Sequence, residues 1–248
     1  MNIATIAPAF TTPDQLVHKL HTHGYGVLAP SAVCELAQCE LPALEALKPS
    51  WNDLPADNFL RDSGHYRRRR HASFVVQGSA VTLIPHRAHW QPLEYNALHG
   101  GMQRLFEPVA PATISQPVWS QLLQAIGSIC SSLKGEQPWY VEAHQFRIDT
   151  TNGIGRPTPE GAHRDGVDFV AILLIAREQV KGGESRVFEA DSSNGQRFTL
   201  TAPWTLLLLD DERVIHESTP IQPTAASGYR DTLVLTYRAG GFQEQAYG

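Results

Sequence analysis

Residues 161–175 read Gly-Ala-His-Arg-Asp-Gly-Val-Asp-Phe-Val-Ala-Ile-Leu-Leu-Ile, a turn that leads into an apolar run. The run from Val167 to Ile175 is typical of a buried strand. Alternate residues of an extended chain point to the same side, so His163 and Asp165 would face one direction, about 6.5 Å apart at Cα. An imidazole and a carboxylate could thus reach one metal ion from a single strand.

A second histidine follows another apolar run. Residues 205–209 read Thr-Leu-Leu-Leu-Leu, and His216 lies shortly beyond them, where a second strand can deliver it. Two imidazoles and one carboxylate on one side of a metal, with the other positions open, is the arrangement of non-haem Fe(II) oxygenases. Structural zinc more often uses several cysteines, and none is near these residues in sequence. Either histidine alone is better interpreted as a satisfied, partly buried side chain, whereas the set His163, Asp165 and His216 favours a metal site.

An arginine opens the last apolar run of the chain. Residues 230–237 read Arg-Asp-Thr-Leu-Val-Leu-Thr-Tyr, and in a strand Arg230 and Thr232 share one face. Both can bond one carboxylate, the arginine through two parallel N–H groups. We therefore expect Arg230 and Thr232 to hold a cosubstrate that carries a carboxylate.

Four segments in residues 140–240 resemble a known family. They are Pro157-Thr158-Pro159-Glu160-Gly161-x-His163-Arg164-Asp165-Gly166-Val167-Asp168-Phe169, Gly182-Gly183-Glu184-Ser185, Leu209-Asp210-Asp211-x-x-Val214-x-His216 and Gly228-Tyr229-Arg230-Asp231. In this order they are similar to the bacterial 2-oxoglutarate/Fe(II) dioxygenases that hydroxylate free L-amino acids, the isoleucine 4-hydroxylase type above all. The first 110 residues contain no motif that matches residue by residue.

The resemblance implies a cofactor, a cosubstrate and a reaction. It implies Fe(II) on His163, Asp165 and His216, and 2-oxoglutarate with its far carboxylate on Arg230 and Thr232. Oxidative decarboxylation would be coupled to hydroxylation or sulfoxidation of a free aliphatic L-amino acid, with dioxygen as the oxidant. Isoleucine, leucine, methionine and threonine are the implied substrates. The mechanism needs no general base, so no catalytic residue is expected beyond the metal centre.

The strand that precedes His163 offers alternative candidates for binding the amino acid. Either His144 and Phe146 or Gln145 and Arg147 face the interior from the preceding strand, and an inward Arg147 would need a carboxylate. That carboxylate could belong to the substrate or to a neighbouring acidic residue. We name Arg147 and Asp168 as the candidate pair for the carboxylate and ammonium of the substrate, with Gln145 beside them.

The run Arg67-Arg68-Arg69-Arg70 allows three interpretations. With Tyr66 and His71 it resembles a nucleic-acid patch. We favour a charged strand or loop whose alternate arginines face solvent, and one of the arginines gripping a substrate carboxylate stays open. The net charge of −5 and the isoelectric point of about 6.1 argue against nucleic acid.

Composition restricts the remaining classes of protein. Hydrophobic residues make up 42% of the 248-residue chain and charged residues 18%, which is typical of a globular protein. No apolar stretch is long enough for a membrane span, and the N-terminus lacks a secretory pattern. The chain has three cysteines, Cys34, Cys39 and Cys130. An odd number favours reduced thiols and therefore a cytoplasmic protein. The oligomeric state is open, and a homodimer is one outcome.

The periodicities predict helices first and strands later. We expect helices at 13–23, 33–47 and 117–134, and strands from residue 26, at 74–78, 81–85, 141–148, 167–175, 185–189, 198–201, 205–209, 214–216 and 232–237. This order favours an α+β, mainly β fold: a double-stranded β-helix, that is a cupin-like jelly-roll barrel, flanked by N-terminal helices. We expect one domain over residues 1–248, with a helical and strand portion at about 1–135 and the jelly-roll core at about 136–240.

Three other functions share part of this pattern. A cupin without oxygenase activity would keep the metal but would not need Arg230. A nucleic-acid demethylase of the same superfamily would explain the arginine run. A binding module could keep the fold without a metal.

Overall fold

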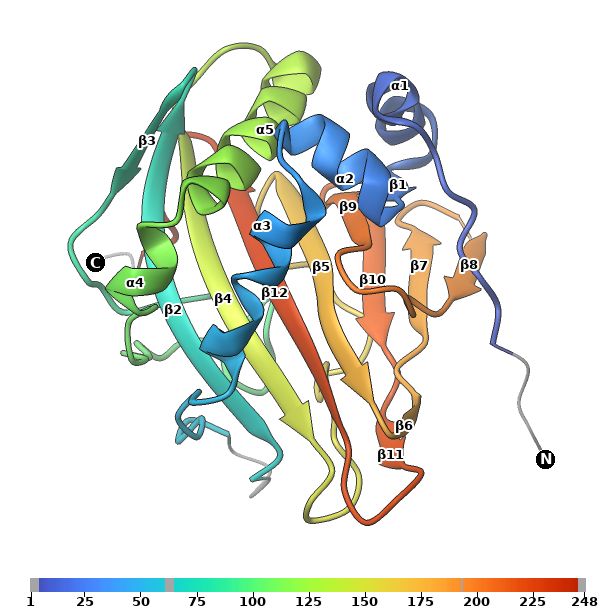
Figure 1. The fold of residues 1–248 in the computed structure, drawn as a ribbon. Helices are drawn as coiled ribbons and strands as arrows, with labels where there is room; N and C mark the ends of the chain where they lie inside the picture. The colour runs from blue at the N-terminus through green and yellow to red at the C-terminus, as the bar shows by residue number, and fades with distance from the viewer. Residues whose placement is uncertain (1–4, 61–64, 193, 245–248) are drawn as a thin grey trace.

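A large antiparallel sheet organises the molecule. The computed structural model describes residues 5–60, 65–192 and 194–244. Seven strands pair in the order β1-β9-β5-β12-β4-β2-β3, and each neighbouring pair is antiparallel. They are β1 Tyr25–Leu28, β2 Arg67–Gln77, β3 Ala80–Leu83, β4 Trp139–Asp149, β5 Phe169–Glu178, β9 Leu206–Asp210 and β12 Tyr229–Arg238. Strands from both halves of the chain therefore share one sheet (Figure 1).

Two smaller sheets lie beside this sheet. β7 Ser185–Glu189 pairs with β8 Gly195–Phe198 and with β10 Val214–Ser218, and β6 Val180–Gly182 pairs with β11 Ile221–Pro223. Val187 and Val214 of the smaller sheet share one buried apolar cluster with Leu174, Leu207 and Leu209 of the large sheet. A mainly β structure with this large antiparallel sheet is consistent with a jelly-roll oxygenase fold.

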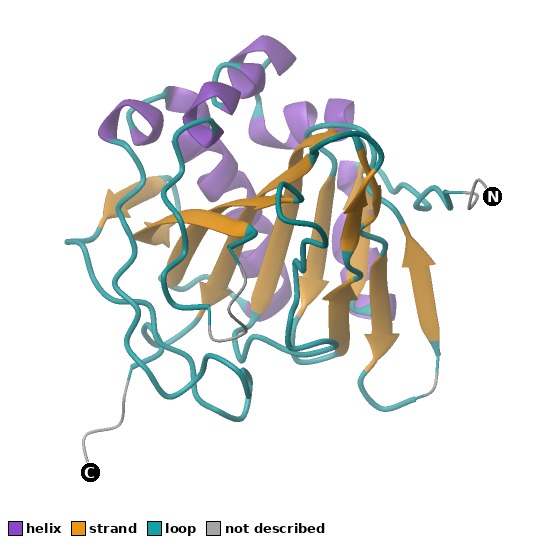
Figure 2. Cartoon of the chain, turned by 90° about the horizontal axis from the view of Figure 1, so that it is seen from below, coloured by secondary structure: helices purple, strands orange, loops and turns teal. Residues whose placement is uncertain are grey.

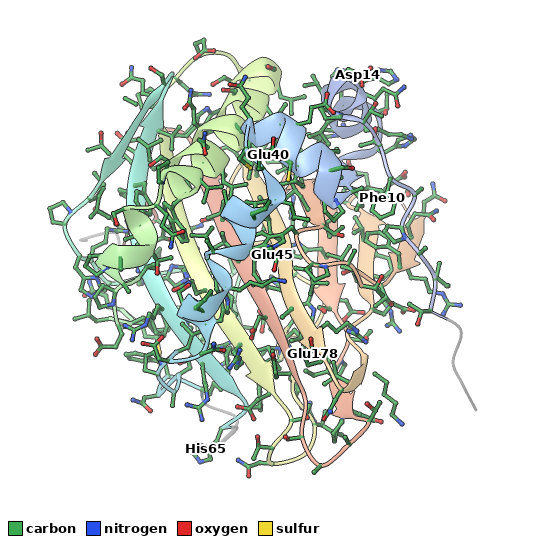
Figure 3. All side chains as sticks on the ribbon, in the orientation of Figure 1. Phe10, Asp14, Glu40, Glu45, His65 and Glu178 are labelled. Carbon is green, nitrogen blue, oxygen red and sulfur yellow. The ribbon has the colours of Figure 1, made fainter. Side chains whose placement is uncertain are left out.

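The helices cover the other face of the large sheet (Figures 1 and 2). They are α1 Pro13–His23, α2 Pro30–Ala37, α3 Leu41–Glu45, the 3₁₀ turn η1 Lys48–Trp51, α4 Pro111–Ile114 and α5 Pro117–Lys134. Their apolar stripes join the sheet in the main core, where Leu122 and Ile126 of α5 cluster with Leu233 and Leu235 of β12. Figure 3 labels Glu45 on this helical side, where its carboxylate accepts a 2.8 Å hydrogen bond from the Trp204 indole.

Alternation along the strands gives the sheet two different faces. On β12, Leu233, Leu235 and Tyr237 enter the main core, whereas Arg230 and Thr232 line a cavity on the opposite face. β4 is divided in the same way. Ala143 points toward the helices, whereas the even-numbered residues His144, Phe146 and Ile148 point toward the cavity. The register pairs Arg67 with Ile148 and Ile148 with Arg230, so one row of the cavity wall contains two arginines.

The structure changes several expected boundaries. The helix expected at 33–47 is divided into α2 and α3, because Gln38 adopts a left-handed conformation at the end of α2. β2 extends back over the whole arginine run, and β5 begins at Phe169 rather than at Val167. The strand expected at 198–201 lies at Gly195–Phe198 instead. None of the helices within the described ranges is long and apolar enough to span a membrane.

Candidate active site

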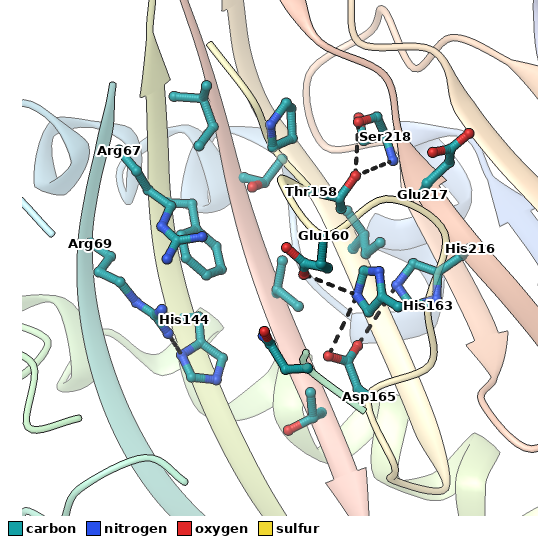
Figure 4. A pocket seen from close by; sticks show the side chains of 18 of the residues that line it. Arg67, Arg69, His144, Thr158, Glu160, His163, Asp165, His216, Glu217 and Ser218 are labelled. Atoms are coloured by element: carbon teal, nitrogen blue, oxygen red, sulfur yellow. Dashed lines mark hydrogen bonds and ion pairs between the residues drawn. The ribbon is translucent and has the colours of Figure 1, made fainter. Parts of the chain in front are cut away.

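The cavity lies between the inner face of the large sheet and the β7–β10 sheet. The large sheet contributes side chains of β2, β4, β5, β9 and β12, and β10 contributes His216. The loop before β5 closes one side with Thr158, Glu160, His163 and Asp165. Figure 4 shows His163, Asp165 and His216 together on one side of the cavity, and Arg67 and Arg69 on the other.

His163, Asp165 and His216 meet as the sequence predicts. The Nε2 atom of His163 is 3.8 Å from Asp165 Oδ1, and the Nε2 atom of His216 is 3.7 Å from Asp165 Oδ2. One ligand atom from each of the three lies within 4.8 Å of the others. Two imidazoles and a carboxylate at this separation fit a small divalent cation such as Fe(II).

The two predicted ligands of the motif come from a loop and not from a strand. His163 and Asp165 precede β5, and a single antiparallel bridge joins His163 to His216. Its two backbone hydrogen bonds are 3.0 and 2.9 Å long. Nδ1 of His163 donates to the Gly161 carbonyl at 2.9 Å, which leaves Nε2 for a metal. The expectation of a ligand strand was wrong, but the bridge brings two of the three side chains together.

A buried aspartate anchors this loop. Both Asp211 oxygens accept backbone hydrogen bonds, from Asp165 N at 3.1 Å, Gly166 N at 2.8 Å and Val167 N at 3.2 Å. Burial, with the nearby Asp165 carboxylate, raises the pKa of Asp211 to about 7. Asp211 therefore fixes the backbone that presents Asp165.

The pKa values of the two histidines shift in opposite directions. Burial, together with the neighbouring His163, lowers the pKa of His216 to about 4. Burial also lowers the pKa of His163, but the Asp165 and Glu160 carboxylates outweigh it, so that the net shift is upward. A divalent cation would replace the proton that these carboxylates favour.

Arg230 presents a buried cation to the same cavity. Its Nε has no hydrogen-bond partner among the described residues. Burial lowers its pKa to about 10, with Arg177 acting in the same direction, yet the guanidinium remains charged at neutral pH. Gly183 packs closely here: a Cβ at this position would lie 3.0 Å from Arg177 Nη1 and 3.5 Å from Arg230 Cδ. With Thr232 beside it on the cavity wall, Arg230 can receive a carboxylate from a bound molecule.

Three more arginines line the opposite wall, and we call Arg67, Arg69 and Arg104 the cationic wall. Asp57 accepts a 2.7 Å hydrogen bond from Arg67 and lies 3.7 Å from Arg69. Arg104 forms no ion pair with any residue in the described part of the chain. The wall thus has more positive charge than its aspartate neutralises.

Next to the cationic wall lie four buried side chains of the types that bind metal ions. His71, His89, Glu142 and His144 each offer an atom within 4.8 Å of the others. However, Arg69 donates to His144 Nδ1 at 2.7 Å, which Figure 4 also shows, and Arg87 donates to Glu142 at 3.0 Å. These two cations would repel a metal ion, so we interpret the group as the support that orients Arg69.

Comparisons with known proteins identify the family. A sequence model described as 2OG-Fe dioxygenase matches residues 48–236. The chain belongs to this family. It is therefore a 2-oxoglutarate-dependent dioxygenase whose cofactors are Fe(II) and 2-oxoglutarate, and the cavity contains a metal-ligand group that fits the iron.

Solved structures of other proteins have the same fold as this chain. A bsmA homolog from Methylobium petroleophilum PM1 is 50% identical, with a TM-score of 0.91 over 99% of this chain and 100% of that one. IDO from Bacillus thuringiensis is 16% identical, with a TM-score of 0.74 over 94% and 100%. The Fe(II)/(alpha)ketoglutarate-dependent dioxygenase TqaL is 20% identical, with a TM-score of 0.71 over 91% and 86%. The last two show the same fold. None of the curated proteins matches the chain significantly.

The predicted substrate pair is not in the cavity of this dioxygenase. Arg147 forms a two-pronged ion pair with Asp231, at 2.8 and 2.7 Å, on the helical face of the sheet. Asp168 accepts from Lys134 at 2.6 Å and from Ala239 N at 2.8 Å. Gln145 donates to Ser50 at 2.8 Å. The expectation was wrong for Arg147 and Gln145 because His144 and Phe146 are the residues of β4 that face the interior. It was wrong for Asp168 because that carboxylate pairs with Lys134 outside the cavity.

Three cavity residues were missed in the sequence. Glu160 belongs to the motif segment, and its position three residues before His163 was the available signal. Gln91 and Arg104 lie in the long connection between β3 and α4, where no periodicity marks them. The arginine run is a strand with the expected alternation: Arg68 faces solvent, whereas Arg67 and Arg69 are buried in the cavity wall.

Proposed function

We propose that this dioxygenase hydroxylates a free L-amino acid with an aliphatic side chain, or oxidises its sulfur, within a single domain. His163, Asp165 and His216 would hold the Fe(II), and Arg230 with Thr232 would bind the far carboxylate of 2-oxoglutarate. Together the iron and the cosubstrate supply dioxygen activation and C–H oxidation. The protein binds, aims and shields the reactants.

One observation carries the choice of a free amino acid. The cavity contains a cationic wall and, on the opposite loop, the Glu160 carboxylate, whose Oε2 is buried without a hydrogen-bond partner among the described residues. A free amino acid has a carboxylate and an ammonium group side by side. It would satisfy both walls at once, whereas buried charges left without partners are costly. We therefore propose the cationic wall and Glu160 in place of Arg147 and Asp168.

The two acids of the reaction would have separate places. Arg67 and Arg230 lie in one row of the sheet with Ile148 between them. Neighbouring strands are about 4.8 Å apart, so the two Cα atoms are about 10 Å apart. One carboxylate can bind Arg230 while a second binds Arg67, without competition for one guanidinium.

Apolar residues complete the cavity. Phe146, Ile172, Leu207 and Val234 line it between the charged groups. These side chains exclude water and give an aliphatic substrate a surface to contact. Isoleucine, leucine, methionine and threonine are the substrates that we propose to test first.

The function can be tested with a screen of the twenty free amino acids for succinate release, with the mass of each product. We expect one or a few aliphatic amino acids to gain a single oxygen atom. N-acetylated and amidated forms of the same substrate should fail, because each leaves a buried charge unpaired. Oxidation of capped or peptide-embedded residues at a comparable rate would instead support a peptide or protein substrate.

Arg67→Met is expected to raise the KM for the amino acid far more than the KM for 2-oxoglutarate. Removing one partner of a buried charge pair costs about 2–5 kcal/mol, a change of about 30-fold or more. Arg147→Met is the matched control, since it removes an arginine from the neighbouring strand on the helical face. Steady-state kinetics that show the larger KM change for Arg147→Met would contradict this placement.

A further inference from the structure

Gln91 connects the metal site to the cationic wall. It lies in the connection between β3 and α4, and its side chain is buried in the cavity. Its backbone carbonyl accepts from Gly101 N at 2.8 Å, and paired hydrogen bonds of 3.0 and 2.9 Å join His89 to Arg104 beside it. This part of the connection is thus held in place independently of the Gln91 side chain.

The Gln91 amide can take one orientation only. Its Oε1 accepts from Arg104 Nη2 at 2.9 Å and from Asn96 Nδ2 at 3.3 Å. Arginine has no acceptor, and Asn96 uses its own oxygen to accept from His99 N at 2.7 Å. The Gln91 NH₂ group must therefore point the other way, where it donates to Asp165 Oδ1 at 3.1 Å.

From this arrangement we propose that Gln91 is a positioning residue that fixes the Asp165 carboxylate for the metal and links it to Arg104. The proposal rests on Asp165 being a metal ligand. Oδ1 is held by Gln91, while Oδ2 is the oxygen nearest His216 Nε2, at 3.7 Å. A carboxylate held at one oxygen loses rotational freedom, so the ligand is oriented before the metal binds.

The link also reaches the wall where we place the substrate carboxylate. Within the described ranges, Arg104 has no ion-pair partner, and the one hydrogen bond of its side chain is to Gln91. An anion that binds Arg104 would therefore act on the guanidinium that holds Gln91. Arg67 lines the same wall but bonds Asp57 and not Gln91, which makes it a matched comparison.

Cobalt(II) binding tests the link without any turnover. We would titrate the full-length, metal-free protein anaerobically with cobalt(II) and record both affinity and the visible absorption bands, which report the ligand geometry. Gln91→Met keeps the side-chain length and removes all three side-chain hydrogen bonds. We expect a cobalt(II) affinity lower by about 10- to 100-fold and altered bands, the usual effect of losing a partner that orients a ligand.

Two arginine variants decide whether the wall takes part. Arg104→Met and Arg67→Met each remove one cation near the metal, which by electrostatics alone tightens metal binding. Arg104→Met also releases Gln91, so we expect it to weaken cobalt(II) binding, and we expect no weakening from Arg67→Met. Thermal unfolding and circular dichroism would check that each variant is folded, and if Gln91→Met does not fold, the arginine pair alone decides.

The results separate this proposal from the assignment of the site. If Asp165→Ala keeps wild-type cobalt(II) affinity, the metal site itself is wrong. If Asp165→Ala loses the metal while folded Gln91→Met and Arg104→Met bind it like the wild type, only the role of Gln91 is overturned. Equal effects of Arg104→Met and Arg67→Met would overturn the link to the wall.

Discussion

Asp165→Ala is expected to abolish 2-oxoglutarate turnover and to remove the iron from the folded protein. The variant leaves two imidazoles of an incomplete ligand set and deletes the carboxylate that lies within 4 Å of both. Loss of a residue that merely orients a ligand costs about 10- to 100-fold in metal affinity, so loss of the ligand should cost more than about 100-fold. His163→Ala and His216→Ala should have the same effect. Iron content by elemental analysis and succinate release measure the two consequences.

Asp168 provides the matched control for this experiment. It lies three residues after Asp165, but its carboxylate pairs with Lys134 outside the cavity. Asp168→Asn should therefore keep the iron and the activity, with an effect on stability only. If one of the alanine variants of His163, Asp165 or His216 retains near-normal iron and turnover, that residue is not a ligand.

The sequence was sufficient to predict that the three proposed metal ligands lie close together, for a physical reason. His163 precedes one buried apolar run of the sequence, and His216 follows another. Such runs form core strands, and the large sheet pairs these two. The prediction needed only two neighbouring strands and not their exact boundaries. It held although His163 and Asp165 lie in a loop, because the Gly161-to-Gly166 turn, the bridge to His216 and the Asp211 anchor replace the strand.

The face of a strand is harder to predict than its existence. For β4, residues of either parity are plausible inside, since both sets contain polar side chains. A shift of one residue exchanges the two faces. The structure places His144 inside and pairs Arg147 with Asp231 outside, a contact between strands that adjoin in the sheet but lie 84 residues apart in the chain.

The cationic wall depends on long-range contacts that no local pattern encodes. Arg67 and Arg69 are tolerated in the interior because Asp57 lies across from both and because Phe106 and Phe146 stack on Arg69, with centroids 3.6 and 4.5 Å from its guanidinium carbon. These partners come from separate parts of the chain. An arginine run in a sequence therefore says little about exposure until its partners are placed.

Arg230→Met is expected to raise the KM for 2-oxoglutarate by about 30-fold to a few thousand-fold. We place the far carboxylate of the cosubstrate on this buried guanidinium, and truncating one partner of such a pair costs about 2–5 kcal/mol. Arg230→Lys should fall in between, because a point ammonium cannot replace a planar donor of two parallel N–H groups. Steady-state kinetics against 2-oxoglutarate measure both effects. Iron affinity without the cosubstrate should hardly change, since Arg230 is not among the residues that could hold the metal.

Arg147→Lys is the control that makes this prediction specific. Arg147 and Arg230 lie on neighbouring strands, where Arg230 pairs with Ile148, next to Arg147 in the chain. Arg147, however, points to the helical face and is neutralised by Asp231, while Arg230 is buried at the cavity with Arg177 as its charged neighbour. A cosubstrate carboxylate would relieve that repulsion between two arginines, so 2-oxoglutarate should also raise the thermal stability of the wild type more than that of Arg230→Met. An unchanged KM for 2-oxoglutarate in both Arg230 variants would mean that the cosubstrate binds the cationic wall instead, and the amino acid would then have to bind elsewhere in the cavity.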